Sequence, residues 1–203
     1  METKVTGIDS KLDKHIDNQR ADFDKVFIKL DGLSGKFASK WVEKAMITLL
    51  AYSAIRNRSF CNIKLRDIDF GENTLRVRKV KGRKEYISNI SSDCVRILLS
   101  YLQEYPRKLD DFLFTTKVRS NQYQTSDIRK FVKVLGRRAK IEKKIYPHLL
   151  RHSLASNMLN RGANIILIKE QLGHDWIQST ENYLTCFPSR IKSEFEIYKP
   201  SYI

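Results

Sequence analysis

The 203-residue sequence has few cysteines and no long apolar segment. Its cysteines, Cys61, Cys94 and Cys186, are odd in number and far apart. This argues against a disulfide framework and favours a reducing compartment. No apolar run approaches the ~20 residues that a membrane-spanning helix needs, and no apolar secretory core or polybasic interfacial helix is visible. We therefore expect a cytoplasmic protein without a membrane partner.

Acidic residues are scarce relative to basic ones. The chain contains 38 Lys and Arg residues against 23 Asp and Glu residues, for a net charge of +15. Residues 1–35 hold six basic and seven acidic residues and net −1, so residues 36–203 net +16. A single-sign excess of this size indicates a polyanionic partner for the larger segment.

Residues 1–35 carry a heptad pattern. Apolar residues and one glutamine recur at alternating spacings of four and three, at Leu12, Ile16, Gln19, Phe23, Val26, Leu30 and Leu33. This spacing is typical of a coiled-coil seam, with Ile16, Phe23 and Leu30 at position a. A single amphipathic helix docked on its own domain is the alternative. The glycines in "DGLSGK" (31–36) favour a helix stop and a short linker.

The rest of the chain predicts one mainly helical α+β domain, residues 36–203, with a C-terminal tail from about 189. An apolar helix is expected over 38–56, followed by β-rich runs at 67–70, 74–80 and 85–90 that form a small three-stranded antiparallel sheet. The helical pattern then returns over about 91–105, 125–139, 147–160, 164–171 and 176–185. Breaks are expected near Pro106, Gly136, Pro147, Gly162 and Gly173.

Three of the four histidines lie within residues 148–174. In "HLLRHS" (148–153), a helix would place His148 and His152 one turn apart, with Arg151 at i+3 from the first. A planar guanidinium beside imidazoles suits a phosphate or carboxylate. His174 follows a glycine in "LGHDW", and Tyr183 lies nine residues further on.

Two basic residues upstream complete an ordered set. Arg56 follows an apolar segment in "AYSAIRN", a costly place for a charge without a partner, and Lys81 lies at the hairpin tip in "KVKGRK". The order Arg … Lys … His-x-x-Arg … His … Tyr resembles that of the catalytic domain of the tyrosine recombinases, the phage-integrase and Xer-type enzymes, over roughly 37–190. The resemblance implies the catalytic set Arg56, Lys81, His148, Arg151, His174 and Tyr183.

The resemblance also implies a reaction, site-specific recombination of DNA. The two arginines would clamp the nonbridging phosphate oxygens, and His148 would act as base toward the Tyr183 hydroxyl, whose ordinary pKa is ~10. Lys81 would protonate the leaving 5′ hydroxyl, and His174 would hydrogen-bond a phosphoryl oxygen. The 3′-phosphotyrosine product conserves the bond energy, so neither ATP nor a metal or other cofactor is expected.

Double-stranded DNA carrying a specific recombination site is the expected partner, and several protomers are expected to assemble on it. The predicted hairpin supplies the candidate DNA contacts, Arg76, Arg78, Lys79, Arg83 and Lys84.

Other interpretations stay open. Arg56 could cap a helix, Lys79 or its basic neighbours could replace Lys81, and His152 fits a structural role. A type IB topoisomerase would use similar chemistry, and a DNA-binding accessory protein would need only the basic charge. A zinc hydrolase is disfavoured because Leu149 occupies the glutamate position of the His-Glu-x-x-His motif.

The sequence also departs from the family pattern. The family usually carries an acidic residue shortly after its first arginine, but "RNRSF" (56–60) has none, and "SAIR" replaces the usual "TGLR". The family's N-terminal DNA-clamping domain does not fit into the residues before the catalytic core. We expect a minimal natural enzyme, one piece of a split integrase gene or a truncated chain.

Overall fold

The structure is a computed structural model that describes residues 39–78, 85–116, 122–142 and 144–174. The expected coiled coil of residues 1–35, the helix over 176–185 and the tail from about 189 lie outside the described residues. None of the helices within these ranges is both long and apolar enough to cross a membrane.

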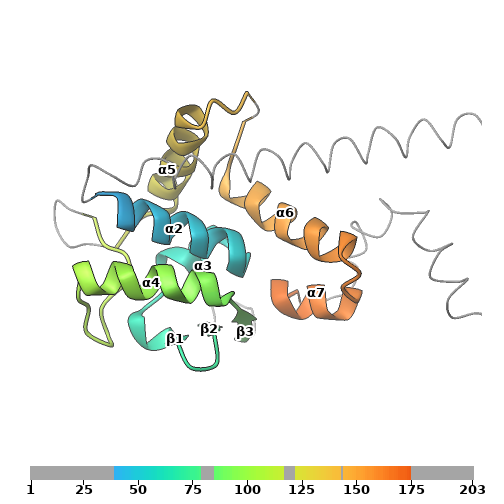
Figure 1. Cartoon of the computed structure of the whole chain (residues 1–203), viewed down its shortest axis with the longest axis horizontal. Helices are drawn as coiled ribbons and strands as arrows, with labels where there is room; N and C mark the ends of the chain where they lie inside the picture. The colour runs from blue at the N-terminus through green and yellow to red at the C-terminus, as the bar shows by residue number, and fades with distance from the viewer. Residues whose placement is uncertain (1–38, 79–84, 117–121, 143, 175–203) are drawn as a thin grey trace, which may run out of the picture.

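The described fold is mainly helical with one small sheet (Figure 1), which confirms the predicted fold class. In chain order its elements are α2 (Ser39–Ser53), α3 (Asn57–Cys61), the 3₁₀ helix η1 (Leu65–Asp67), β1 (Ile68–Asp69), β2 (Thr74–Val77), β3 (Tyr86–Asn89), α4 (Ser92–Glu104), α5 (Thr125–Arg138), α6 (Pro147–Asn160) and α7 (Ile165–Leu172).

The three strands form an antiparallel sheet in the order β1-β2-β3. Leu75 of β2 pairs with Ile68 of β1 on one side and with Ser88 of β3 on the other. Alternation along β2 buries Leu75 and Val77 and exposes Arg76, as expected for a sheet with one face on the core. As the last strand in this order, β3 has one edge without a partner strand among the described residues.

The main core lies between the sheet and helices α2, α4 and α5. Its fully buried side chains include Leu49 and Leu50 of α2, Leu75 of β2, Leu98 of α4 and Ile128 of α5. Burial of such side chains stabilises the fold by roughly 1.5–3 kcal/mol each. In Figure 1, α2 and α4 run side by side, and their contact is extensive.

A second, smaller core joins α6 and α7 to the end of α2. It consists of Ala54, Ala155, Leu159, Ile168 and Leu172, all nearly inaccessible to solvent. Figure 1 shows α6 and α7 together at one end of the described fold, with β3 beside α7. This core therefore packs α6 and α7 against the residue that follows α2.

One local prediction was wrong. The first helix ends at Ser53 rather than at 56, because Ala54 adopts the left-handed conformation with φ of 51°. Arg56 is therefore the N-cap residue of α3, a short helix that the sequence pattern did not indicate. The helix expected over 125–139 is α5, and Gly136 lies inside it, two residues before its end at Arg138. A β-carbon at Gly136 would lie only 3.1 Å from Ile145, so this glycine permits close packing.

Other start and stop signals are confirmed. Pro147 occupies the first turn of α6, where its missing N–H is not needed. Gly162 follows the C-cap Arg161 with φ of 91°. Gly173 is the C-cap residue of α7 and is left-handed, with φ of 56°. These positions set the α6–α7 unit that carries the candidate site.

Candidate active site

Arg151 is a charged residue that is almost fully buried, with 2% exposure. It extends from α6, and its two Nη groups donate to the carbonyl oxygens of Ala54 and Leu172, the latter at 2.6 Å. Burial of a charge is costly unless it is hydrogen-bonded, and each hydrogen bond from a charged group contributes about 1.5–3 kcal/mol. Both carbonyls lie at helix C-termini, where the helix dipole favours a cation.

Arg56 reaches the same helix end. Its Nη1 and Nη2 donate to the Gly173 carbonyl at 3.2 and 3.3 Å. The sequence places no acidic residue just after Arg56, and the structure places a main-chain acceptor against it. Because a carbonyl carries no formal charge, these hydrogen bonds orient the guanidinium without neutralising it. We call Arg56, Arg151 and the carbonyls of Ala54, Leu172 and Gly173 the arginine seat.

Gly173 is required by the geometry of this seat. Its left-handed conformation lets the Gly173 and His174 amides donate back to the carbonyls of Glu170 and Lys169. A β-carbon at this position would lie 2.4 Å from the ring of Tyr86 on β3. Only glycine therefore fits both the backbone angle and the space, and His174 leaves the helix directly beside the seat.

His148 and His152 lie one turn apart on α6, as predicted. Their rings meet edge to face with centroids 4.3 Å apart. Partial burial lowers the pKa of His148 below its ordinary value, and the charges of Arg151 and Arg56 lower it further. Burial also lowers the pKa of His152, with contributions from His148 and Arg151. Both imidazoles are thus held largely neutral at pH 7, the form that can accept a proton.

Four of the six candidate catalytic residues therefore gather around the C-terminal end of α7. Arg56 and Arg151 are joined through adjacent carbonyls, His148 is close enough to sense both charges, and His174 follows Gly173. Lys81 and Tyr183 lie outside the described residues. Among the described residues, no group of three or more His, Cys, Asp or Glu side chains is placed to hold a metal ion.

Comparison with known proteins identifies the family. The model of the phage integrase family matches residues 30–190. The chain belongs to the phage integrase family. Tyrosine recombinase XerA of Pyrococcus furiosus is 34% identical over 160 residues, covering 76% of this chain and 54% of that protein. A tyrosine recombinase of Thermosipho africanus is 33% identical over 143 residues, covering 70% of this chain and 49% of its own.

Solved structures of this family share the fold. The crystal structure of a XerA recombinase superposes with a TM-score of 0.71 at 30% identity and covers 92% of this chain and 64% of its own. A XerH site-specific recombinase bound to a palindromic difH substrate gives a TM-score of 0.72 at 21% identity. The match covers 89% of this chain and 52% of that chain. This phage integrase family member spans about half the length of the curated relatives that it matches.

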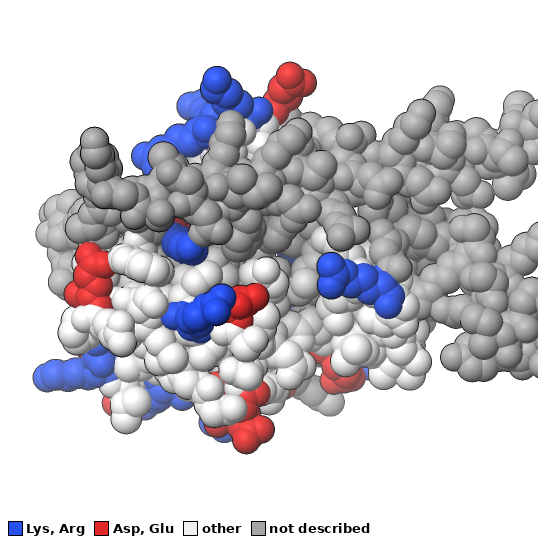
Figure 2. Space-filling view, in the orientation of Figure 1, with Lys and Arg blue, Asp and Glu red and all other residues white. Residues whose placement is uncertain are grey.

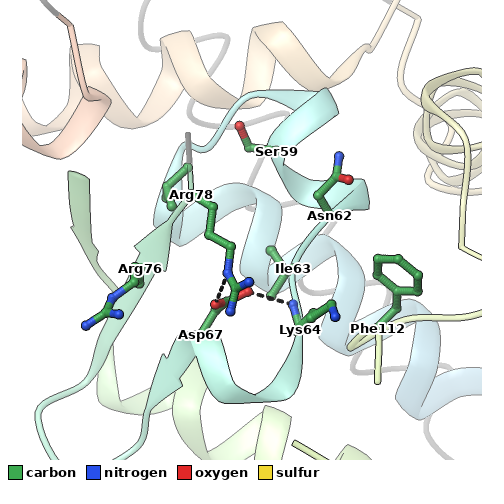
Figure 3. Close-up of a pocket in the computed structure, with 9 residues that line it drawn as sticks. Ser59, Asn62, Ile63, Lys64, Asp67, Arg76, Arg78 and Phe112 are labelled. Carbon is green, nitrogen blue, oxygen red and sulfur yellow. Dashed lines mark hydrogen bonds and ion pairs between the residues drawn. The ribbon is translucent and has the colours of Figure 1, made fainter. Parts of the chain in front are cut away.

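The hairpin residues predicted to contact DNA divide into three groups. Lys79, Arg83 and Lys84 lie outside the described residues. Arg76 is exposed on β2. Arg78 forms an ion pair with Asp67, in which its Nε lies 2.6 Å from Oδ1 of the carboxylate. The same carboxylate accepts a hydrogen bond from the Lys64 main-chain amide at 2.9 Å (Figure 3).

This ion pair borders an open pocket of about 250 Å³ between β2 and α3. Figure 3 shows Arg78 reaching down to Asp67, whereas Arg76 points away from that carboxylate. Lys64 at the same pocket lies 3.8 Å from Asp110. Because Arg78 at the end of β2 pairs with the Asp67 carboxylate, we assign this ion pair a role in fixing the base of the hairpin.

Sequence reasoning missed a basic surface on α5. Four exposed cations, Arg129, Lys130, Lys133 and Arg137, fall within about 100° of the helix circumference at 100° per residue. Figure 2 shows basic side chains gathered over this helix. None of the four joins an ion pair of the described chain, whereas Arg138 on another side pairs with Glu43. The i, i+4 spacing of Arg129, Lys133 and Arg137 in the sequence was sufficient to predict a basic face on this helix.

Two buried cysteines and two tyrosines of the described chain are poorly suited to attack a phosphate. Burial raises the pKa of the Cys94 thiol to about 12 and, with the Asp127 charge, that of Cys61 to about 11. Burial likewise raises the pKa of Tyr101 and Tyr123 above the ordinary value. A raised pKa disfavours the anionic form that attacks a phosphate.

Proposed function

We propose that this chain is the catalytic part of a site-specific DNA recombinase that cleaves and rejoins DNA through a 3′-phosphotyrosine intermediate. The observation that supports this best is the arginine seat, which holds two guanidiniums beside His148 and His174 without a carboxylate in those hydrogen bonds. Such a pair suits the negative charge that develops on a phosphodiester under attack.

The proposed step is a transesterification. The Tyr183 hydroxyl attacks the phosphorus, the bond from phosphorus to the 5′ oxygen breaks, and a phosphotyrosine bond forms in its place. His148, held largely neutral, accepts the phenolic proton, and Lys81 gives a proton to the 5′ oxygen as it leaves. His174 and the two arginines bind the nonbridging oxygens. The reverse step, with a new 5′ hydroxyl, rejoins the strand.

A nicked suicide duplex tests this proposal. The nick lets a short fragment bearing the 5′ hydroxyl diffuse away after cleavage, which traps the covalent protein–DNA adduct. We expect a salt-resistant adduct in EDTA, because two arginines and a lysine supply the charge that metals provide in many nucleases. Strict dependence of cleavage on added Mg²⁺ would contradict the proposal. Relaxed circles without recombinant products, in an assay with two target sites, would favour a topoisomerase instead.

We propose that the basic face of α5 contributes to the DNA surface, together with Arg76 on β2. Exposed cations on two elements can neutralise several phosphates, and this electrostatic contribution is independent of DNA sequence. The location of this surface is supported by the exposure of Arg129, Lys130, Lys133 and Arg137 on one face of α5.

We also propose that residues 1–35 assemble protomers on DNA. This rests on the heptad pattern and on a net charge of −1 in a basic chain. Phe23→Asp would introduce a charge into the seam. Analytical ultracentrifugation should show a lower oligomeric state for this variant than for the unaltered chain. Identical monomers with and without DNA would indicate that the segment packs on its own domain.

A further inference from the structure

Gln171, on the last turn of α7, binds the open edge of β3. Its Oε1 accepts from the Asn89 amide at 2.9 Å and from Asn89 Nδ2 at 3.2 Å, and its Nε2 donates to the Asn89 carbonyl at 2.8 Å. The side-chain amide thereby pairs with the N–H and C=O of one strand residue, as a neighbouring strand would. Gln171 is 5% exposed, so water does not readily replace these contacts.

The same amide continues into a buried chain of hydrogen bonds. Gln171 Nε2 also donates to Ser88 Oγ at 3.0 Å, and Ser88 Oγ donates to the Ser53 carbonyl at 2.8 Å. Ser88 and Ser53 are both completely buried. One strand, β3, thus holds the last turn of α7 and the last residue of α2 at the same time.

These contacts lie one residue before the acceptors of the arginine seat. Gln171 precedes Leu172, and Ser53 precedes Ala54, whose carbonyls bind Arg151. Gly173, the C-cap residue of α7, accepts from Arg56 and packs on the ring of Tyr86, also on β3. A shift of α7 along β3 would therefore move both guanidiniums together.

We propose that Gln171 is a positioning residue for the transesterification. Its amide fixes α7 against β3 so that the arginine seat meets the phosphate in the transition state. This inference rests on the proposed function. It predicts a defect in the chemical step rather than in DNA affinity, because Gln171 itself is buried away from solvent and carries no charge.

Gln171→Met tests the inference, since methionine keeps the length of the side chain and removes every hydrogen bond. The matched control is Gln122→Met in the same full-length chain. Gln122 Nε2 donates to the Cys61 carbonyl at 2.8 Å and to Asn62 Oδ1 at 2.9 Å. This change therefore also removes amide contacts between two segments, but at the opposite end of α3 from Arg56. Circular dichroism checks that each variant is folded.

Two suicide duplexes give the decisive readout, one with the normal phosphodiester and one with a methylphosphonate at the cleaved bond. The methylphosphonate lacks one charged nonbridging oxygen and so depends less on the arginines. On the phosphodiester we expect Gln171→Met to slow single-turnover adduct formation at saturating DNA by ~10-fold or more, with the Kd within ~2-fold. On the methylphosphonate, the rates of adduct formation by Gln171→Met and by the unaltered chain should differ by only ~3-fold or less. Gln122→Met should match the unaltered chain on both.

Unaltered cleavage of the phosphodiester by Gln171→Met, or an equal loss on both substrates, would overturn the inference. Ser88→Ala serves as a second variant, and we expect a smaller defect of the same kind. The side-chain ¹⁵N–¹H signals of Arg56 and Arg151 give a readout that needs no DNA: they should shift in Gln171→Met and stay in place in Gln122→Met. Absence of any adduct from the unaltered chain would instead refute the proposed function, whatever the arginine signals show.

Discussion

Arg56 and Arg151 are held by the carbonyl oxygens of two consecutive residues, Gly173 and Leu172. One turn of backbone at the end of α7 therefore sets the positions of both guanidiniums. Carboxylate partners would also orient them, but would offset the positive charge that the phosphate requires. The helix end supplies only a partial negative charge. These hydrogen bonds to carbonyls therefore do not offset the full positive charge of the two guanidiniums.

Gly173→Ala should damage the seat, and Gly162→Ala offers a matched control. Both glycines have positive φ, 56° and 91°, but a β-carbon at Gly162 has open space while one at Gly173 meets Tyr86 at 2.4 Å. The backbone conformation alone costs roughly 1–2 kcal/mol for alanine, and overpacking adds about 1–3 kcal/mol. Urea unfolding should show the larger loss of stability for Gly173→Ala, together with slower adduct formation. Equal losses of stability for the two variants would mean that the Tyr86 ring moves away from the added β-carbon without destabilising the fold.

His148 should titrate below the ordinary histidine pKa of ~6.5. Partial burial is the main cause, and the charges of Arg151 and Arg56 add to it. Removal of a nearby positive charge makes protonation easier, so Arg56→Gln should move the His148 pKa upward. NMR titration of the imidazole protons measures this, with Arg58→Gln as control because the exposed Arg58 is not among the causes of the shift. An unchanged pKa in Arg56→Gln would place Arg56 too far away to assist His148.

Tyr183→Phe should abolish the covalent adduct while DNA affinity stays within ~2-fold, because the change removes one hydroxyl and no positive charge. Tyr146→Phe is the control: Tyr146 is exposed two residues before His148, so its hydroxyl is another candidate near the site. This variant should form the adduct normally. Peptide mapping of the adduct to Tyr146, Tyr198 or Tyr202 would refute the assignment of Tyr183.

Local sequence signals predicted the elements that carry the site. Pro147 marked the start of α6, the His-x-x-Arg spacing placed His148 and Arg151 on that helix, and the hairpin pattern gave β2 and β3. Each of these depends on residues close together in the chain, so propensity and period suffice to find them.

The arrangement that holds the site could not be predicted in the same way. The hydrogen-bond acceptors of Arg151 are main-chain carbonyls at the ends of α2 and α7. Every residue has such a carbonyl, so the sequence does not indicate which ones bind the guanidinium. Gln171 resembles any polar residue of an amphipathic helix until β3 is placed beside it. Arg78 looked like one more hairpin cation, and only the fold brings Asp67 against it.

The basic face of α5 supplies the last prediction. Lys130 and Lys133 are exposed and lie on the same face, so Lys130→Gln with Lys133→Gln should remove up to two phosphate contacts. Each contact contributes about 0.9 to the slope of log K against log salt, so the slope should become shallower by ~1–2. Arg96→Gln with Lys108→Gln removes the same net charge from exposed positions on α4 and just after it. If the face of α5 contacts DNA, the first variant alone changes the slope; equal changes in both would mean that only overall charge matters.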